Sequence, residues 1–92
     1  MVNKEVDDKV FIGLADIPNY VSACFVALSQ HDHIYLIGRG NHVKKACDIL
    51  AIMIREYLDN SKYEVEIGSE YHEKRFVTTI SIKLSGKKKD KD

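Results

Sequence analysis

The segment 37–45 combines glycines with positive charges at the expected start of a helix, a pattern typical of anion binding. Gly38 and Gly40 let the backbone approach a ligand closely, and the free N–H groups of a first helical turn attract negative charge. Three side chains add full positive charges, namely Arg39, Lys44 and Lys45. The spacing matches neither a P-loop nor a dinucleotide fingerprint, so we expect no nucleotide cofactor. The alternative is a tight strand-to-helix turn with solvated basic residues.

The histidines and cysteines do not form a catalytic or metal-binding pattern. None of the four histidines has a partner at the spacing of metal ligands; they are His31, His33, His42 and His72. Cys24 and Cys47 lie in apolar stretches, which suits small buried residues in a reducing compartment. No serine is set in a nucleophile turn. We therefore expect a protein that is not an enzyme and that needs no metal and no cofactor.

Length and composition indicate one soluble domain. The chain has 92 residues, of which 45% are hydrophobic and 30% are charged, and a chain of this length holds a single core. No apolar run approaches the roughly 20 residues of a membrane-spanning helix, and the charged N-terminus does not resemble a secretory signal. We therefore expect no membrane association and an intracellular location, in the cytoplasm and nucleoid or, in a eukaryote, in the nucleus and cytoplasm.

Positive charge is local, because the formal net charge of the chain is zero. Residues 1–85 hold ten basic and twelve acidic side chains, whereas residues 86–92 hold four lysines and two aspartates. Within the first of these ranges, residues 37–62 carry five basic and three acidic side chains. Any electrostatic contact should therefore involve the middle of the chain and the tail.

The first half of the chain predicts a strand, a helix and a second strand. Residues 9–14 form a short β-branched and aromatic run. Asp16 and Pro18 are typical of a helix start, the first as a cap and the second in the first turn. Apolar residues recur every three or four positions over 19–30, which predicts one buried helical face. The nearly all-apolar run 34–37 predicts a central strand buried on both faces.

The second half predicts a longer helix and a hairpin. Asn41 is placed as an N-cap for a helix over residues 42–60. Alternating apolar and polar residues predict antiparallel strands at 63–68 and 76–84. The polar segment 69–75 between them predicts the projecting tip of the hairpin.

These elements follow the order βαβαββ, which predicts a single α/β domain over residues 9–85. An N-terminal segment, residues 1–8, precedes it. The lysine-rich tail, residues 86–92, contains no apolar side chain and is expected to be disordered.

The apolar surface of the second helix is wider than one stripe, because Ile49, Ile52 and Met53 extend it. In so small a domain a second copy of the chain is the natural cover, so we predict a dimer that buries Leu50, Met53 or Ile54 between protomers. The alternative is a helix that is sunk more deeply into its own core.

Several segments together resemble the Alba family of chromatin and other DNA- and RNA-binding proteins. They are residues 11–13, 19–21, 37–40, 45–48, 67–69 and 77–82. The resemblance implies two helices on one face of a four-stranded sheet, as in the C-terminal domain of bacterial translation initiation factor three. It also implies a dimer that contacts a duplex through the first βα loop, the turn before the second helix, and the hairpin arms.

Carried over by position, Arg39 falls on a phosphate-contacting position and Lys45 on a helical lysine of the same surface. A loop that carries a lysine pair in chromatin members is here Leu14-Ala15, and Asn41, Ile54 and Glu56 stand where basic residues are common. Tyr57 falls on an aromatic position that in the family serves contacts between dimers, so we include Tyr57 in the expected interface.

We therefore predict a sequence-tolerant nucleic-acid-binding dimer of modest affinity, favouring RNA or acting with a more basic Alba-like paralogue as a heterodimer. The expected contact residues are Arg39, Gly40, Asn41, Lys44, Lys45, Lys74 and Arg75. The alternative is an assembly module that pairs with another Alba-like chain and has little affinity of its own.

Overall fold

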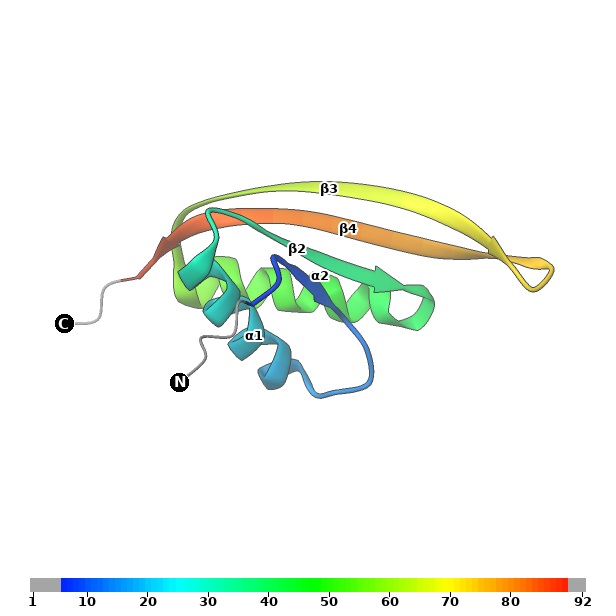
Figure 1. Ribbon diagram of the computed structural model, residues 1–92, viewed down its shortest axis with the longest axis horizontal. Helices are drawn as coiled ribbons and strands as arrows, with labels where there is room; N and C mark the ends of the chain where they lie inside the picture. The colour runs from blue at the N-terminus through cyan, green and yellow to red at the C-terminus, as the bar shows by residue number, and fades with distance from the viewer. Residues whose placement is uncertain (1–5, 90–92) are drawn as a thin grey trace.

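Two helices pack against one face of a four-stranded sheet, and within residues 6–89 no helix covers the opposite face (Figure 1). The computed structural model describes residues 6–89. In chain order the elements are β1 (Lys9–Phe11), α1 (Ile17–Gln30), β2 (Ile34–Arg39), α2 (Val43–Ile52), β3 (Leu58–His72) and β4 (Arg75–Lys88). A 3-10 turn, Gly40–His42, precedes α2, and a π-helical turn, Met53–Tyr57, follows it. The predicted two-layer fold and its βαβαββ order are confirmed.

The strands lie in the order β1-β2-β4-β3, with β1 parallel to β2 and the other pairs antiparallel. The place of β2 inside the sheet confirms the predicted central strand. The expectation that this strand is buried on both faces is wrong. Ile34 and Leu36 are buried in the core, whereas Tyr35 and Ile37 are only partly covered on the open face.

The hydrophobic core lies between the sheet and the helices. It includes Val21, Cys24 and Ala27 of α1, Ala46, Ile49, Leu50 and Met53 of the second helical segment, and Ile34, Leu36, Ile80, Ile82 and Leu84 of the sheet. Burial raises the pKa of the Cys24 thiol to about 12, as expected for a small apolar core residue. Cys47 is exposed on α2, so the same expectation is wrong for that cysteine.

Both helices begin without the side-chain caps that the sequence suggests. Pro18 does lie in the first turn of α1, but Asp16 makes no side-chain capping hydrogen bond and instead accepts one from Asn19 N–H through its carbonyl, at 3.0 Å. Asn41 lies in the 3-10 turn, and His42 is the N-cap residue of α2. No helix within residues 6–89 is long and apolar enough to cross a membrane.

Two glycines allow the tight connection between β2 and α2. A Cβ atom at Gly38 would lie 2.8 Å from the carbonyl oxygen of His42, so any side chain there would force the strand and the helix apart. Gly40 has a φ of +53°, in the left-handed region that L-residues with side chains rarely adopt. The 3-10 turn therefore starts directly at the end of β2.

β3 and β4 form a long antiparallel arm, much longer than the predicted strands (Figure 1). Glu73 and Lys74 alone form the turn, with φ angles of 49° and 67°, which is the geometry of a type I′ hairpin. Most of the segment 69–75, predicted as a loop, is therefore paired strand. At the other end the helical segment stops at Tyr57, so the prediction of a helix to residue 60 is wrong.

The end of β4 is attached to the helices, which corrects the prediction of disorder from residue 86. Lys87 pairs with Asp59 of β3. The Lys88 ammonium lies 3.9 Å from the ring centroid of Phe25 on α1 and donates a hydrogen bond to Ser29. Ordered structure therefore continues through residue 88, and residues 90–92 lie outside the described residues.

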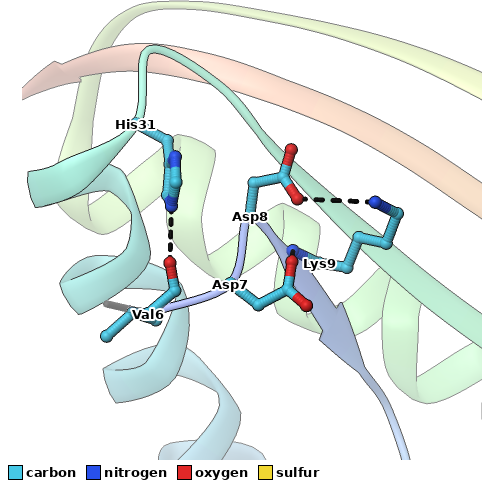
Figure 2. A network of polar contacts seen from close by, with 5 residues as sticks. All are labelled: Val6, Asp7, Asp8, Lys9 and His31. Carbon is cyan, nitrogen blue, oxygen red and sulfur yellow. Dashed lines mark hydrogen bonds and ion pairs between the residues drawn. The ribbon is translucent and has the colours of Figure 1, made fainter. Parts of the chain in front are cut away.

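Residues 6–9 are attached to the end of α1 (Figure 2). His31 Nε2 donates to the carbonyl oxygen of Val6 at 2.6 Å, and Val6 N–H donates to Gln30 Oε1 at 2.9 Å. The Asp7 carboxylate accepts from the backbone N–H of Lys9 at 3.1 Å, and this hydrogen bond holds the pKa of Asp7 below its usual value. The packed domain therefore begins before the predicted boundary at residue 9, and residues 1–5 lie outside the described residues.

Candidate nucleic-acid interface

The basic residues singled out in the sequence lie at the end of β2, on the first turn of α2 and at the tip of the β3–β4 arm. Figure 1 shows the turn between β2 and α2 in the half of the molecule that lies away from both termini, and the tip of the β3–β4 arm projects beyond this turn. We call this surface the basic end and define it by its five cations: Arg39, Lys44, Lys45, Lys74 and Arg75. The fold thus places side chains that are separated by up to 36 positions in the sequence on the same half of the molecule.

Arg39, the last residue of β2, is paired with an acidic residue of the arm. Its Nη2 atom lies 2.9 Å from Oε1 of Glu70, and the two side chains are 51% and 56% exposed. An exposed ion pair of this kind contributes little to stability and exchanges readily with water and ions. A phosphate group can therefore compete with Glu70 for the Arg39 guanidinium. The sequence pattern did not reveal this partner, because the pairing depends on the long arm.

Lys44 and Lys45, adjacent in the first turn of α2, differ in their surroundings. Lys44 Nζ lies 2.9 Å from Asp48 Oδ2 one turn along the helix, and this hydrogen bond raises the pKa of Lys44 above its usual value. Lys45 Nζ instead donates to two backbone carbonyls, Gly13 O at 2.8 Å and Ala15 O at 2.9 Å. Lys45 therefore holds the loop before α1, a task that sequence reasoning missed when it assigned this lysine to the ligand.

Gly40 and Asn41, the two uncharged residues of the predicted contact set, lie in the 3-10 turn between Arg39 and α2. Both are exposed. Because Asn41 does not cap α2, its amide side chain remains available at the surface of the basic end. The geometry is that of a connecting turn beside a helix N-terminus.

The arm tip carries the remaining two cations. Lys74 is the second residue of the turn and Arg75 is the first residue of β4, paired with His72. Both are exposed, and neither takes part in the ion pairs observed within residues 6–89. In this respect they differ from Arg39 and Lys44, each of which is paired with a protein carboxylate.

The residues predicted for the dimer interface do not form one exposed surface. Met53 is 0% exposed and Leu50 is 8% exposed, and both pack in the core of their own protomer. Ile54 is partly buried against that core. Tyr57 lies at the surface, with its ring 5.9 Å from that of Phe25 in an edge-on contact. Met53 and Leu50 are therefore core residues of their own protomer.

The arm instead presents an apolar strip that the sequence analysis did not assign to an interface. Val65 and Ile67 lie opposite Ile82 and Ile80, so they point to the helix-bearing side of the sheet. No part of the described chain covers them, and Ile67 is 70% exposed. We call this surface the arm strip; its large side chains are Tyr63, Val65, Ile67, Tyr71 and Phe76. Their alternation was visible in the sequence as far as residue 67, but the uncovered face was not.

Comparisons with known proteins agree with this architecture. A curated relative, "DNA/RNA-binding protein Alba" from Nitrosopumilus maritimus, is 30% identical over 91 residues, covering 90% of this chain and 95% of the relative. The solved structure of Alba from Thermoplasma volcanium superposes with a TM-score of 0.70 at 24% identity, covering 84% of this chain and 98% of that one. ALBA1 from Trypanosoma brucei gives a TM-score of 0.76 at 13% identity, covering 87% of this chain and 69% of that one.

The structural likeness at these identities shows the fold. The family is shown by the sequence comparisons, because the Alba family model matches residues 8–69 and so spans β1 to β3. With the curated relative at 30% identity over nearly the whole chain, this match shows that the protein belongs to the Alba family.

Proposed function

We propose that this chain binds DNA or RNA through its basic end, with little dependence on base sequence. The observation that carries the proposal is that exposed cations lie on the β2–α2 turn, as Arg39, and on the tip of the β3–β4 arm, as Lys74 and Arg75, both in the half of the molecule that lies away from the termini. Cations on a turn and on a projecting arm are suited to phosphate oxygens, which are alike at every nucleotide. The curated relative named as a DNA/RNA-binding protein supports the same ligand class. We infer from this binding role that the protein acts inside the cell and is not an enzyme.

The expected affinity is modest. Glu70 already neutralises Arg39 and Asp48 already neutralises Lys44, while Lys45 is engaged by backbone carbonyls. The formal net charge of the chain is zero, so the protein as a whole does not attract a polyanion. Binding therefore depends on local contacts that compete with internal ion pairs.

The working form in this proposal is a dimer formed through the arm strip. An exposed apolar strip of this extent is unfavourable in water, and a two-fold related copy offers the same strip as a cover. Pairing two arms would also bring two basic ends into one particle, which doubles the number of phosphate contacts. Two residues of the dimer interface predicted from the sequence remain accessible for such contacts: Ile54, at the edge of the core, and Tyr57.

The test is a titration of the purified homodimer with duplex DNA, duplex RNA and single strands at low and moderate salt. The unaltered protein should bind at low salt, and Arg39→Glu should weaken binding to unrelated sequences by the same factor. Lys9→Glu, the same charge reversal on β1, serves as the control. Undiminished binding by a folded Arg39→Glu variant would place the site elsewhere. Binding that requires a second Alba-like chain would support an assembly role instead.

A further inference from the structure

We propose that the open face of the sheet binds an extended cationic segment of another protein, whose arginine side chain enters a hollow between Phe11 and Glu66. The open face is the side of the sheet that carries no helix within residues 6–89. This contact takes a ligand of opposite charge to nucleic acid, and it does not depend on the function proposed above.

The strand registers show which side chains share the open face. Val10, Leu36 and Ile82 are buried toward the helices, so their neighbours along each strand point the other way. Two adjacent rows therefore cross the open face from β1 or β2 to β3. The first row is Phe11, Ile37, Ser81 and Glu66, and the second is Arg39, Thr79 and Gly68.

The middle of both rows is occupied by short side chains, and the face is hollowed there. A hollow of about 740 Å³ is lined by Ser81 and Thr79 on β4, by Phe11 on β1 and by Glu66 on β3. A Cβ atom at Gly68 would lie 3.0 Å from Oγ1 of Thr79, so a side chain at this position would crowd the floor. The hollow therefore has an apolar wall on one side and an acidic wall on the other.

The apolar wall consists of Phe11 and Ile37, which are register partners on β1 and β2. Phe11 is 64% exposed on the edge strand of the sheet, and Ile37 is partly covered. An aromatic ring in this position offers its face to a cation, and to a planar guanidinium above all. The aliphatic stem of an arginine would lie against the same wall.

The acidic wall is formed by β3, which directs Glu64, Glu66 and Glu70 to the open face. Glu70 is paired with Arg39 at 2.9 Å. Glu66 stands opposite Ser81 and takes part in none of the ion pairs observed within residues 6–89. Its carboxylate can therefore accept two hydrogen bonds from one guanidinium.

A second, smaller hollow extends the site along the strands. It has a volume of about 350 Å³ and is lined by Tyr35, Glu64 and Lys83, and it shares Glu66 and Ser81 with the first. Two residues on one face of a strand are about 7 Å apart, which is also the spacing of alternate side chains in an extended peptide. A segment that lies along β3 would thus place successive alternate side chains in the two hollows.

The charge of the acidic wall selects the kind of partner. The carboxylates of Glu64, Glu66 and Glu70 would repel the phosphates of a nucleic acid. An uncharged peptide would cover Glu66 without supplying a hydrogen-bond partner, which costs free energy. An arginine satisfies the carboxylate and stacks on Phe11, whereas the compact ammonium of lysine offers neither a planar face nor a bidentate fork. We therefore assign arginine to the first hollow, with an apolar neighbour in the segment.

The test uses the full-length protein and a fluorescein-labelled peptide of Gly-Leu-Arg repeats, with binding measured by fluorescence anisotropy. The peptide should bind, and the backbone amide NMR signals of residues 11, 37 and 66 should shift. A peptide of Gly-Leu-Lys repeats has the same charge and should bind about fivefold more weakly. A peptide of Gly-Leu-Glu repeats should not bind.

Variants on the two walls examine each contact separately. Glu66→Gln should weaken binding of the arginine peptide by about tenfold. Phe11→Leu keeps an apolar side chain and removes the ring, so it should abolish the preference for arginine over lysine. Glu56→Gln on the π-helical turn and Val26→Leu on α1 are the matched controls and should bind both peptides as the unaltered protein does. Circular dichroism checks that each variant is folded.

Three results would overturn the proposal. The first is failure of the unaltered protein to bind the arginine peptide, and the second is equal affinity of the Glu66→Gln and Glu56→Gln variants for it. The third comes from Phe11→Ser, which removes the apolar wall and should weaken peptide binding without changing the sedimentation or the affinity for duplex DNA. If Phe11→Ser instead dissociated an oligomer, the face would be covered by a second copy, and if it reduced only DNA binding, the face would contact nucleic acid.

Discussion

The Arg39 guanidinium at the end of β2 lies 2.9 Å from the Glu70 carboxylate on the β3–β4 arm. This ion pair joins the turn before α2 to the arm, two parts of the basic end that are far apart in the sequence. In the proposed binding mode, Glu70 competes with a phosphate group for the Arg39 guanidinium. Removal of the Glu70 charge should show how strongly it competes.

We expect Glu70→Gln to tighten binding to DNA and RNA by about twofold to fivefold at low salt, because it frees Arg39 and removes one repulsive charge from each protomer. The change in thermal stability should be small, since the ion pair is exposed. Fluorescence anisotropy with labelled duplexes measures the affinity. Glu56→Gln makes the same change in net charge next to Arg55 on the π-helical turn and should leave affinity nearly unchanged. Equal gains in both variants would indicate a general charge effect.

The arm strip is expected to hold the dimer together. Ile67→Lys places a charge on this strip and should give a monomer by sedimentation at protein concentrations where the unaltered chain is a dimer. Glu66→Lys is the control. Glu66 precedes Ile67 on β3, and its side chain points to the open face of the sheet, whereas the Ile67 side chain points to the helix-bearing face. A dimeric Ile67→Lys protein would place the interface on another surface.

Met53 should affect stability rather than assembly. Since its side chain is 0% exposed in the core of its own protomer, Met53→Ala is expected to lower the free energy of unfolding by about 2–5 kcal/mol. Denaturant titration at a fixed protein concentration measures the loss, and sedimentation at a concentration well above dissociation should still find a dimer. If Met53→Ala lowered the free energy of unfolding by less than about 1 kcal/mol and also dissociated the dimer, Met53 would be an interface residue.

The two cysteines should differ in reactivity. Burial raises the pKa of Cys24 to about 12 and Cys47 is exposed, so at pH 8 a thiol reagent should modify one cysteine per folded chain and both in denaturant. Because folding raises the pKa of Cys24, its protonated thiol stabilises the folded protein at pH values below 9.0, the ordinary pKa of the group. This contribution to the free energy of unfolding should decline as the pH rises from 9.0 toward 12. Rapid reaction of two thiols in the folded protein would show that Cys24 is accessible.

The order of the elements was predictable because it depends on local periodicity, and the fold followed from that order. The ends of the elements were not predictable from the sequence. The helix expected to reach residue 60 stops at Tyr57, because Leu58 enters the sheet opposite Lys88. The lysines after Gly86 look disordered by composition, yet Lys87 and Lys88 are strand residues because β3 supplies their partners. Contacts between distant segments decided both cases, and these contacts leave no local pattern.

The cations of the basic end were found in the sequence, but their partners were not. Local spacing reveals a pair such as Lys44 and Asp48, which lie one helical turn apart. The partners of Arg39 and Lys45 lie about 30 positions away and come from other elements. Sequence reasoning therefore counted Arg39 and Lys45 as free cations, although the fold assigns the first to an ion pair and the second to two backbone carbonyls of the loop before α1.

The most direct test of binding through the basic end is the salt dependence of affinity for two unrelated duplexes, measured with the homodimer. If Arg39, Lys74 and Arg75 each meet one phosphate, a dimer neutralises about six, and the logarithm of the association constant should fall against the logarithm of salt concentration with a slope of roughly −5 on B-DNA. The slope should be the same for both sequences. A slope near zero, or no binding at low salt, would contradict binding of the phosphate backbone by this surface.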